Sequence, residues 1–117
     1  MSTRIDLADL PAAVAARGQV AYLLSVRGDH DPGPHVVSVA VEVVGDQLVV
    51  GAGRTTSGNV EHHPAVTLLW PLSPDFPDHS LVVDGLATLA PDGATISIRP
   101  TGAILHVATP SSPDRRC

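Results

Sequence analysis

The chain has 117 residues, which is enough for one domain with one hydrophobic core, and a net charge of −5 at pH 7. Every basic residue is an arginine, and none of them forms the basic stripe that nucleic-acid binding requires, so nucleic acid is not an expected partner. The single cysteine, Cys117, excludes an intrachain disulfide and the usual cysteine metal sites.

The cellular context also follows from composition. No basic segment followed by an apolar run opens the chain, and no stretch approaches the roughly 18 apolar residues of a membrane span. We expect a cytoplasmic protein that has no membrane partner. Hydrophobic residues make up 44% of the chain but aromatic residues only 3%, so valine, leucine, isoleucine and alanine must fill the core, and valine at this density favours strands.

The first 18 residues predict a short packing helix that Gly18 ends. Asp6 and Asp9 are both possible N-caps, and Pro11 makes Asp9 the better candidate, because proline prefers an early helical position. Residues 20–26 alternate in a way that predicts the first strand, and the loop of residues 28–34 follows it.

Residues 36–70 carry the strongest pattern. Residues 36–44 have a period of two, Gly45-Asp46 suits a two-residue hairpin turn, and residues 47–52 return antiparallel. The run GAGRTTSGN then predicts a polar loop suited to holding a phosphate, in which Ser57 is a possible cap for a short helical turn ended by Pro64. Residues 65–70 predict a fourth strand.

The second half predicts further short strands. The proline-rich residues 71–79 cannot form a central strand, whereas residues 81–90 alternate again, with a bulge or bend at Asp84-Gly85. A hairpin signal at residues 91–93 precedes two predicted strands, residues 94–99 and 104–108, and residues 109–117 predict a frayed tail. These elements favour a mainly β single domain over residues 1–117, a compact antiparallel barrel with one or two short helices and its core over about residues 19–108.

Three segments in this order resemble the FMN-binding split-barrel family related to pyridoxamine 5'-phosphate oxidase. They are PHVVSVAVEVVGDQLVV, GRTTSGNVEHHPAVTLLW, and SLVVDGLATL followed by PTGAILHVA. The resemblance implies a six-stranded antiparallel split barrel that works as a homodimer, with FMN sites at the subunit interface. It also implies an oxidoreductase that transfers a hydride between the flavin and a small organic substrate.

The resemblance also assigns candidate cofactor-binding residues by position. It implies that Arg54 is the phosphate cation and that its polar neighbours are Thr55, Thr56, Ser57 and Asn59. Residues near the second strand would line the ring, namely Val36, Val37 and Ser38, with Trp70 reaching across the interface.

One departure from the family pattern keeps alternatives open. Family members often place a second basic residue a few positions after the arginine, where this chain has Ser57-Gly58-Asn59. Fewer charge-assisted contacts to a phosphate dianion are then available. A deazaflavin coenzyme, or no cofactor at all, is therefore an alternative to FMN. A non-catalytic module that carries or senses flavin, deazaflavin or haem, or one with a degenerate site, is the alternative to an enzyme.

Other motifs are weaker. The adjacent His62 and His63 do not have a ligand spacing that predicts a metal site. No G-x-S-x-G motif is present, so a serine hydrolase is not expected and no catalytic side chain is assigned. Asp84, which interrupts an apolar strand, is expected to reach solvent.

Overall fold

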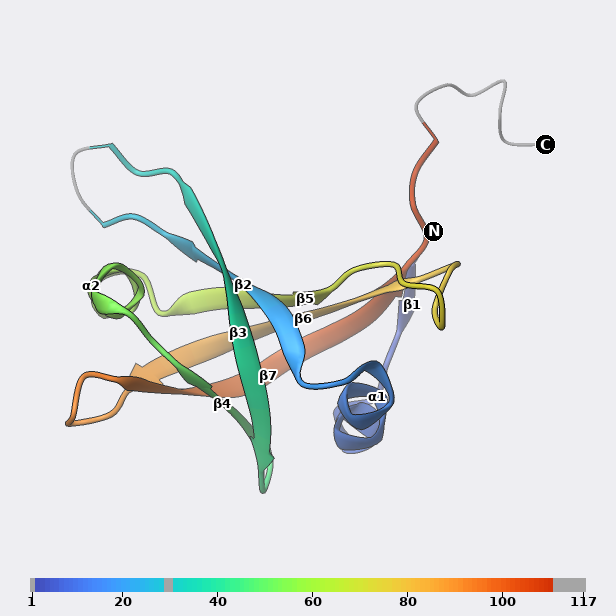
Figure 1. The fold of residues 1–117 in the computed structure, drawn as a ribbon, viewed down its shortest axis with the longest axis horizontal. Coiled ribbons are helices and arrows are strands. Elements are labelled where there is room, and N and C mark those ends of the chain that lie inside the picture. Colours follow the sequence, from blue (N-terminus) through green and yellow to red (C-terminus); the bar gives the residue numbers. More distant parts are fainter. Residues whose placement is uncertain (1, 29–30, 111–117) are drawn as a thin grey trace.

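The structure, a computed structural model, describes residues 2–28 and 31–110, which form seven strands, two α-helices and one 3-10 helix (Figure 1). In chain order the elements are β1 (Ser2–Arg4), η1 (Leu7–Asp9), α1 (Leu10–Arg17), β2 (Val20–Val26), β3 (Pro34–Val44), β4 (Gln47–Gly51), α2 (Arg54–His62), β5 (Ala65–Trp70), β6 (Ser80–Leu89) and β7 (Thr95–His106). Residues 111–117 of the predicted frayed tail and His30 lie outside the described residues.

Six of the strands form a closed antiparallel barrel, which confirms the predicted fold class. The order is β7-β4-β3-β2-β5-β6, and the additional pairing of β6 with β7 closes the ring. β1 is a seventh strand that pairs with the end of β7, and it was not predicted from the sequence. The core consists of buried apolar side chains from both helices and six strands, and Leu23, Leu68, Leu81, Val83, Ile96 and Ile98 are fully buried.

The two helices lie at opposite ends of this barrel (Figure 1). Both predicted cap candidates precede a helical segment, but Asp6, and not the favoured Asp9, makes the capping hydrogen bond. Asp6 adopts an extended conformation and its Oδ1 accepts a hydrogen bond from the Ala8 N–H at 3.1 Å, so the segment begins with the 3-10 turn η1. Asp9 already has helical angles and makes no capping hydrogen bond with its side chain. Gly18 ends α1 at φ +100°, as expected.

The predicted polar loop after β4 is also corrected. α2 begins at Arg54 directly after Gly53, so the residues RTTSGN belong to the helix. Threonine, glycine and asparagine are poor helix formers. They are helical here because one side of α2 packs against β2 and β6, which buries Thr56 and Val60.

The β6–β7 hairpin contains the predicted bulge. Asp84 pairs with Gly102 and Gly85 pairs with Pro100, so Thr101 is an extra residue on β7. This bulge accommodates Pro100 within a single strand of twelve residues. The prediction of two separate strands at residues 94–99 and 104–108 was therefore wrong.

The segment between β5 and β6 has no regular strand, as predicted, and is held against α1. The Arg17 guanidinium lies 3.9 Å from the centre of the Phe76 ring and donates a hydrogen bond to the carbonyl oxygen of His79 at 2.9 Å. Burial lowers the pKa of this guanidinium from its ordinary value. Within the part of the chain that the structure describes, no helix is long and apolar enough to cross a membrane.

Candidate functional site

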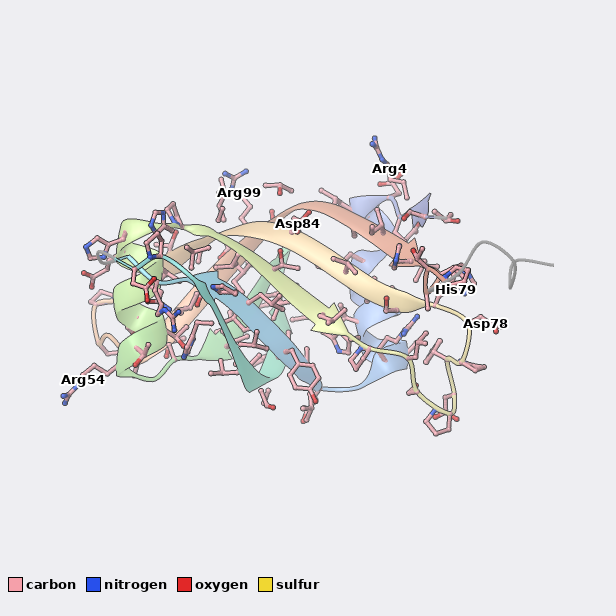
Figure 2. All side chains as sticks on the ribbon, turned by 90° about the horizontal axis from the view of Figure 1, so that it is seen from above. Arg4, Arg54, Asp78, His79, Asp84 and Arg99 are labelled. Atoms are coloured by element: carbon pink, nitrogen blue, oxygen red, sulfur yellow. The ribbon has the colours of Figure 1, made fainter. Side chains whose placement is uncertain are left out.

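The start of α2 presents hydrogen-bond donors at the surface. Gly53 is the N-cap and no side chain caps the helix, so the first backbone N–H groups have no side-chain partner. Arg54 and Thr55 occupy the first turn and are exposed, and Figure 2 shows Arg54 reaching away from the body of the molecule. Among residues 2–28 and 31–110, neither side chain has a hydrogen bond or ion pair. A guanidinium, a hydroxyl and free N–H groups together fit a phosphate.

The other polar residues assigned to the phosphate are tied into the fold. Ser57 is buried and its Oγ donates a hydrogen bond to the Gly93 carbonyl oxygen at 2.9 Å, so it does not cap α2 as predicted. Asn59 is buried and its Nδ2 donates to Ser25 Oγ at 3.1 Å. Thr56 is buried as well. In this chain, Arg54 and Thr55 are the two candidates whose side chains remain free at the surface.

An open groove lies beside this helix start, on the outer face of the barrel. Its volume is about 510 Å³, and it is lined by Gln19, Ala40, Glu42, Val49, Gly51 and Thr95, together with the edges of two buried valines. Gly51 lies three residues before Arg54, so the chain between them spans at most about 10 Å. We call this the β3–β4 groove; Gly51, at its edge, is the lining residue that the chain connects most directly to Arg54.

The residues predicted to line a ring lie near this groove but not in it. Val36 and Ser38 are exposed on the outer face of β3, where they pair with Leu24 and Tyr22 of β2. Val37 is half-buried on the opposite face of the strand. Ala40 and Glu42 lie on the same outer face as Ser38, farther along β3, and both line the groove. The assignment of Val36, Val37 and Ser38 to the ring stays a prediction.

Trp70 is an interior residue of its own chain. Its side chain is 2% exposed and its Nε1–H donates to the Gly18 carbonyl oxygen at 3.0 Å. The structure therefore does not bring Trp70 together with Arg54. The hydrogen bond of Trp70 instead ties the end of β5 to the turn between α1 and β2. No group of three or more metal-ligating side chains occurs among the described residues.

An exposed apolar surface adjoins the groove. Val20, Tyr22 and Val36 are 68%, 42% and 53% exposed, and they lie on one face because β2 and β3 pair in register. Ala40 pairs with Val20 and also lines the groove, so the two surfaces are continuous. We call the surface formed by Val20, Tyr22 and Val36 the β2–β3 face. Patches of this kind mark interaction sites.

Comparisons with known proteins agree with this architecture. Two uncharacterized proteins, one from Mycobacterium bovis and one from Mycobacterium tuberculosis, are each 38% identical to the chain over 128 aligned positions, which cover 94% of this chain and 86% of the relative. The chain belongs to the same family as these mycobacterial proteins. No family model matches it.

Solved structures show which fold this family has. A putative pyridoxamine 5'-phosphate oxidase from Listeria innocua is similar with a TM-score of 0.67 at 24% identity, covering 86% of this chain and 98% of the other. An F420 reductase is similar with a TM-score of 0.61 at 22% identity over 74% and 90% of the two chains. A heme binding protein from Mycobacterium smegmatis has a TM-score of 0.59 at 16% identity over 84% and 52%. The fold is the split barrel of pyridoxamine 5'-phosphate oxidase-like proteins, as the sequence resemblance implied.

Proposed function

We propose that this split barrel is a flavin-dependent oxidoreductase that binds FMN, or alternatively a deazaflavin, in the β3–β4 groove. The observation that supports the proposal is the short link between Gly51, which lines the groove, and Arg54, three residues later at the uncapped start of α2. Arg54 and Thr55 have no other partner among the described residues. Arg54 and the N–H groups would hold the terminal phosphate. Ala40, Val49 and Gly51 would contact the ring system.

The bound cofactor would accept or donate a hydride from a small organic substrate, and the chain would orient the reactants. Residues that line the groove include Glu42, but nothing in the fold requires a side chain to act as an acid or base. The proposed role of this chain is to bind the phosphate, to fix the ring against β3 and β4, and to exclude water from one side of it.

We propose that the protein works as a homodimer. The β2–β3 face is apolar, exposed and continuous with the groove through Ala40. A second copy covering this face would bury those side chains and would add a further wall to the open groove. The cofactor site would then lie at the interface, as the family resemblance implies, and we expect the protein in the cytoplasm.

A non-catalytic binding module is the second candidate. One observation favours it: Thr56, Ser57 and Asn59 are buried, so of the five polar residues assigned to the phosphate only Arg54 and Thr55 present their side chains at the surface. A haem carrier is less well supported, because the residues that line the groove include no histidine, cysteine, methionine or tyrosine as an axial ligand.

Cofactor titration tests the proposal. Purified protein is titrated with FMN and with a deazaflavin coenzyme, and binding is followed by the quenching of ligand fluorescence. Saturable binding followed by reduction with a nicotinamide coenzyme or another small donor would support the enzyme. Saturable binding without any reduction would favour the carrier, and the absence of binding to either ligand would overturn both.

A further inference from the structure

A pocket of about 330 Å³ lies between one side of α2 and the residues that follow β2. It is lined by Arg27, Gly28, Thr55, Gly58, Asn59 and His62. The four helical residues are three or four positions apart in sequence, so they lie along one side of α2. The volume is at the lower end of the range of small-molecule sites. We call this the α2 pocket.

Arg27 lies on the side of the β2–β3 hairpin that faces α2. Ser25 is buried on that side, where its Oγ accepts a hydrogen bond from Asn59 Nδ2 at 3.1 Å. Side chains two residues apart in an extended strand point to the same side. The Arg27 N–H donates to the Gly33 carbonyl oxygen at 2.9 Å, so strand-like pairing continues as far as residue 27. The side chain of Arg27 therefore leaves the backbone on the same side as Ser25.

Gly33 determines where the guanidinium of Arg27 lies. A Cβ added at Gly33 would overlap Arg27 Nη2 and would lie 3.2 Å from Arg27 Cζ. The guanidinium is therefore folded over the backbone of residue 33, in space that any other residue would fill with its own side chain. This position directs the charge across the hairpin at the edge of the α2 pocket.

The far wall of the α2 pocket is fixed by His62. Its Nδ1 lies 3.0 Å from the Gly58 carbonyl oxygen, and since a carbonyl oxygen can only accept, Nδ1 carries the proton. The ring also packs directly on Gly28, where an added Cβ would lie 2.8 Å from Nδ1. Asn59 is buried behind this wall. The pocket thus has a preformed side that does not depend on a ligand.

Two groups of the α2 pocket are free to bind a ligand. Among residues 2–28 and 31–110, the Arg27 guanidinium and the Thr55 hydroxyl have no hydrogen bond or ion pair. Both residues are exposed, and no acidic side chain is among the described residues that line the pocket. The pocket is therefore locally positive, although the whole chain has a net charge of −5.

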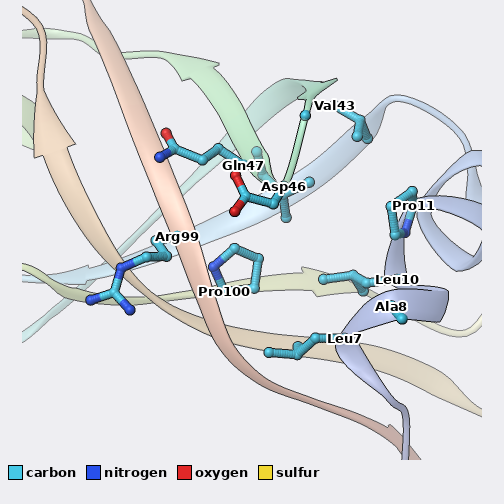
Figure 3. Close-up of a pocket in the computed structure, with 11 residues that line it drawn as sticks. Leu7, Ala8, Leu10, Pro11, Val43, Asp46, Gln47, Arg99 and Pro100 are labelled. Carbon is cyan, nitrogen blue, oxygen red and sulfur yellow. The ribbon is translucent and has the colours of Figure 1, made fainter.

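Other cavities of the barrel do not have this charge. The β3–β4 groove is lined by Glu42. A cavity of about 500 Å³ beside η1 and α1 is lined by Asp46, and Figure 3 shows the Arg99 side chain directed away from Leu7 and Leu10. Neither cavity combines a free cation with the absence of a carboxylate, so the α2 pocket is the better candidate for an anion.

We propose that the α2 pocket binds a phosphate group through the Arg27 guanidinium and the Thr55 hydroxyl. A planar guanidinium can donate two parallel hydrogen bonds to phosphate oxygens, and such charge-assisted bonds are stronger than neutral ones. Gly58 leaves room for the ligand, because a Cβ added there would meet nothing within 4 Å. Thr55 is also a donor in the proposed cofactor site, so the group is either the cofactor's phosphate or that of a separate small molecule.

Phosphate titration tests the pocket without any flavin. Inorganic phosphate, phenyl phosphate and the uncharged control phenol are titrated into isotope-labelled full-length protein at constant ionic strength, and backbone amide shifts are followed by NMR. We expect both phosphates to give saturable shifts at Gly28, Thr55 and Gly58, and phenol to give none there. No saturable shifts at millimolar phosphate, or equal shifts with phenol, would overturn the proposal.

Variants separate the charge from its position. Arg27→Met should weaken phenyl phosphate binding about tenfold, because a charge-assisted contact is lost. Gly33→Ala keeps the charge but displaces the guanidinium, so it should also weaken binding, whereas stability should change little because a flexible side chain gives way. Arg4→Met, an equal loss of charge far from Arg54 and α2 (Figure 2), should change affinity by less than about twofold. Unchanged affinity in Arg27→Met, or an equal loss in Arg4→Met, would contradict the proposed site.

A gain of charge provides a second check. Since Gly58 faces open space, Gly58→Lys adds a cation beside Thr55 and should restore phenyl phosphate binding in the Arg27→Met protein. Arg27 is exposed, so its substitution should not unfold the barrel, and thermal unfolding of each variant checks this. Failure of Gly58→Lys to raise the affinity in a folded protein would place the anion outside the α2 pocket.

Competition identifies the source of the phosphate group. FMN and riboflavin are each added to protein saturated with phenyl phosphate. Displacement by FMN but not by riboflavin would assign the α2 pocket to the phosphate of the cofactor, and FMN binding without displacement would assign it to a separate phosphorylated ligand. If neither flavin binds, the cofactor proposal fails, and the phosphate titration still decides whether the α2 pocket is an anion site.

Discussion

The hydroxyl of Ser57, in the middle of α2, donates a hydrogen bond to the carbonyl oxygen of Gly93, in the turn between β6 and β7, at 2.9 Å. Gly93 adopts φ +72° in that turn, and its own N–H bonds to the Ala90 carbonyl oxygen. A residue that the sequence pattern suggested as a ligand contact thus fastens the helix to the hairpin that closes the barrel. The site proposed at the start of α2 therefore depends on the tertiary position of this helix.

The first prediction concerns this bond. Ser57→Ala should lower the free energy of unfolding by about 0.5–1.5 kcal/mol, because a buried hydrogen bond is lost and the hydroxyl has no second partner among the described residues. FMN affinity should change by less than about threefold, because the Ser57 hydroxyl is not expected to contact the phosphate and its loss should shift α2 only slightly. Chemical denaturation and fluorescence titration measure the two quantities. Weakened FMN binding at unchanged stability would instead assign the hydroxyl to the phosphate.

The second prediction is that Arg54 contacts the phosphate of FMN. Arg54→Ala should weaken FMN binding about tenfold or more, because a charge-assisted contact to the phosphate is lost, while stability stays unchanged at this exposed position. Riboflavin, which lacks the phosphate, should bind equally to both proteins. Arg4→Ala removes an equal charge from the exposed strand β1 and serves as the control. Equal losses in the two variants would indicate general electrostatics, and no loss in Arg54→Ala would remove this residue from the site.

Dimer formation can be tested with two exposed valines that lie on the same face of one strand. Val36 and Val44 are 53% and 50% exposed on β3, but Val44 lies eight residues, or about 27 Å, farther along at the hairpin end. Val36→Glu places a charge in the β2–β3 face and should shift sedimentation towards the monomer. Val44→Glu should leave the dimer intact. A wild-type chain that sediments as a monomer at micromolar concentration would contradict the proposed interface.

The bulge at Asp84 and Gly85 gives a stability prediction. A Cβ added at Gly85 would lie 2.6 Å from Ile98 Cγ2 and 2.8 Å from the Arg99 carbonyl oxygen, and the second of these atoms is backbone that cannot rotate away. Gly85→Ala should therefore cost about 1–3 kcal/mol of stability. Gly102→Ala, also in the hairpin, adds a methyl group to open space and should cost less than half as much. Equal unfolding midpoints for the two variants would show that β7 moves away without penalty.

Local turn chemistry accounts for what could be predicted from the sequence. Gly45 and Gly93 take the positive φ values of +63° and +72° that their turns need, and the Asp84-Gly85 step does mark a bulge. Period-two alternation also identified the strands of the barrel, because the side chain that follows an inward one must point outward. These features depend on neighbours in the sequence and are visible in it.

The errors have a common physical origin in distant contacts. The helical state of RTTSGN depends on packing against β2 and β6, and the continuity of β7 through Pro100 depends on a bulge opposite Gly85. The burial of Ser57 and Asn59 depends on Gly93 and Ser25, which are 36 and 34 residues away in the chain. Composition and spacing alone could not reveal that these polar groups already have partners, so the candidate site is smaller than the motif suggested.

β7 is the strand that closes the ring, and it pairs with β6, β4 and β1. During synthesis on the ribosome, β4 can pair with β7 only after the chain has emerged as far as Ile98, and β6 can complete its pairing only when His106 has emerged. Until then each presents an unpaired row of amide and carbonyl groups to other nascent chains. Truncated products that end before β7 are therefore expected to aggregate, and the fold is expected to form after translation of its last strand.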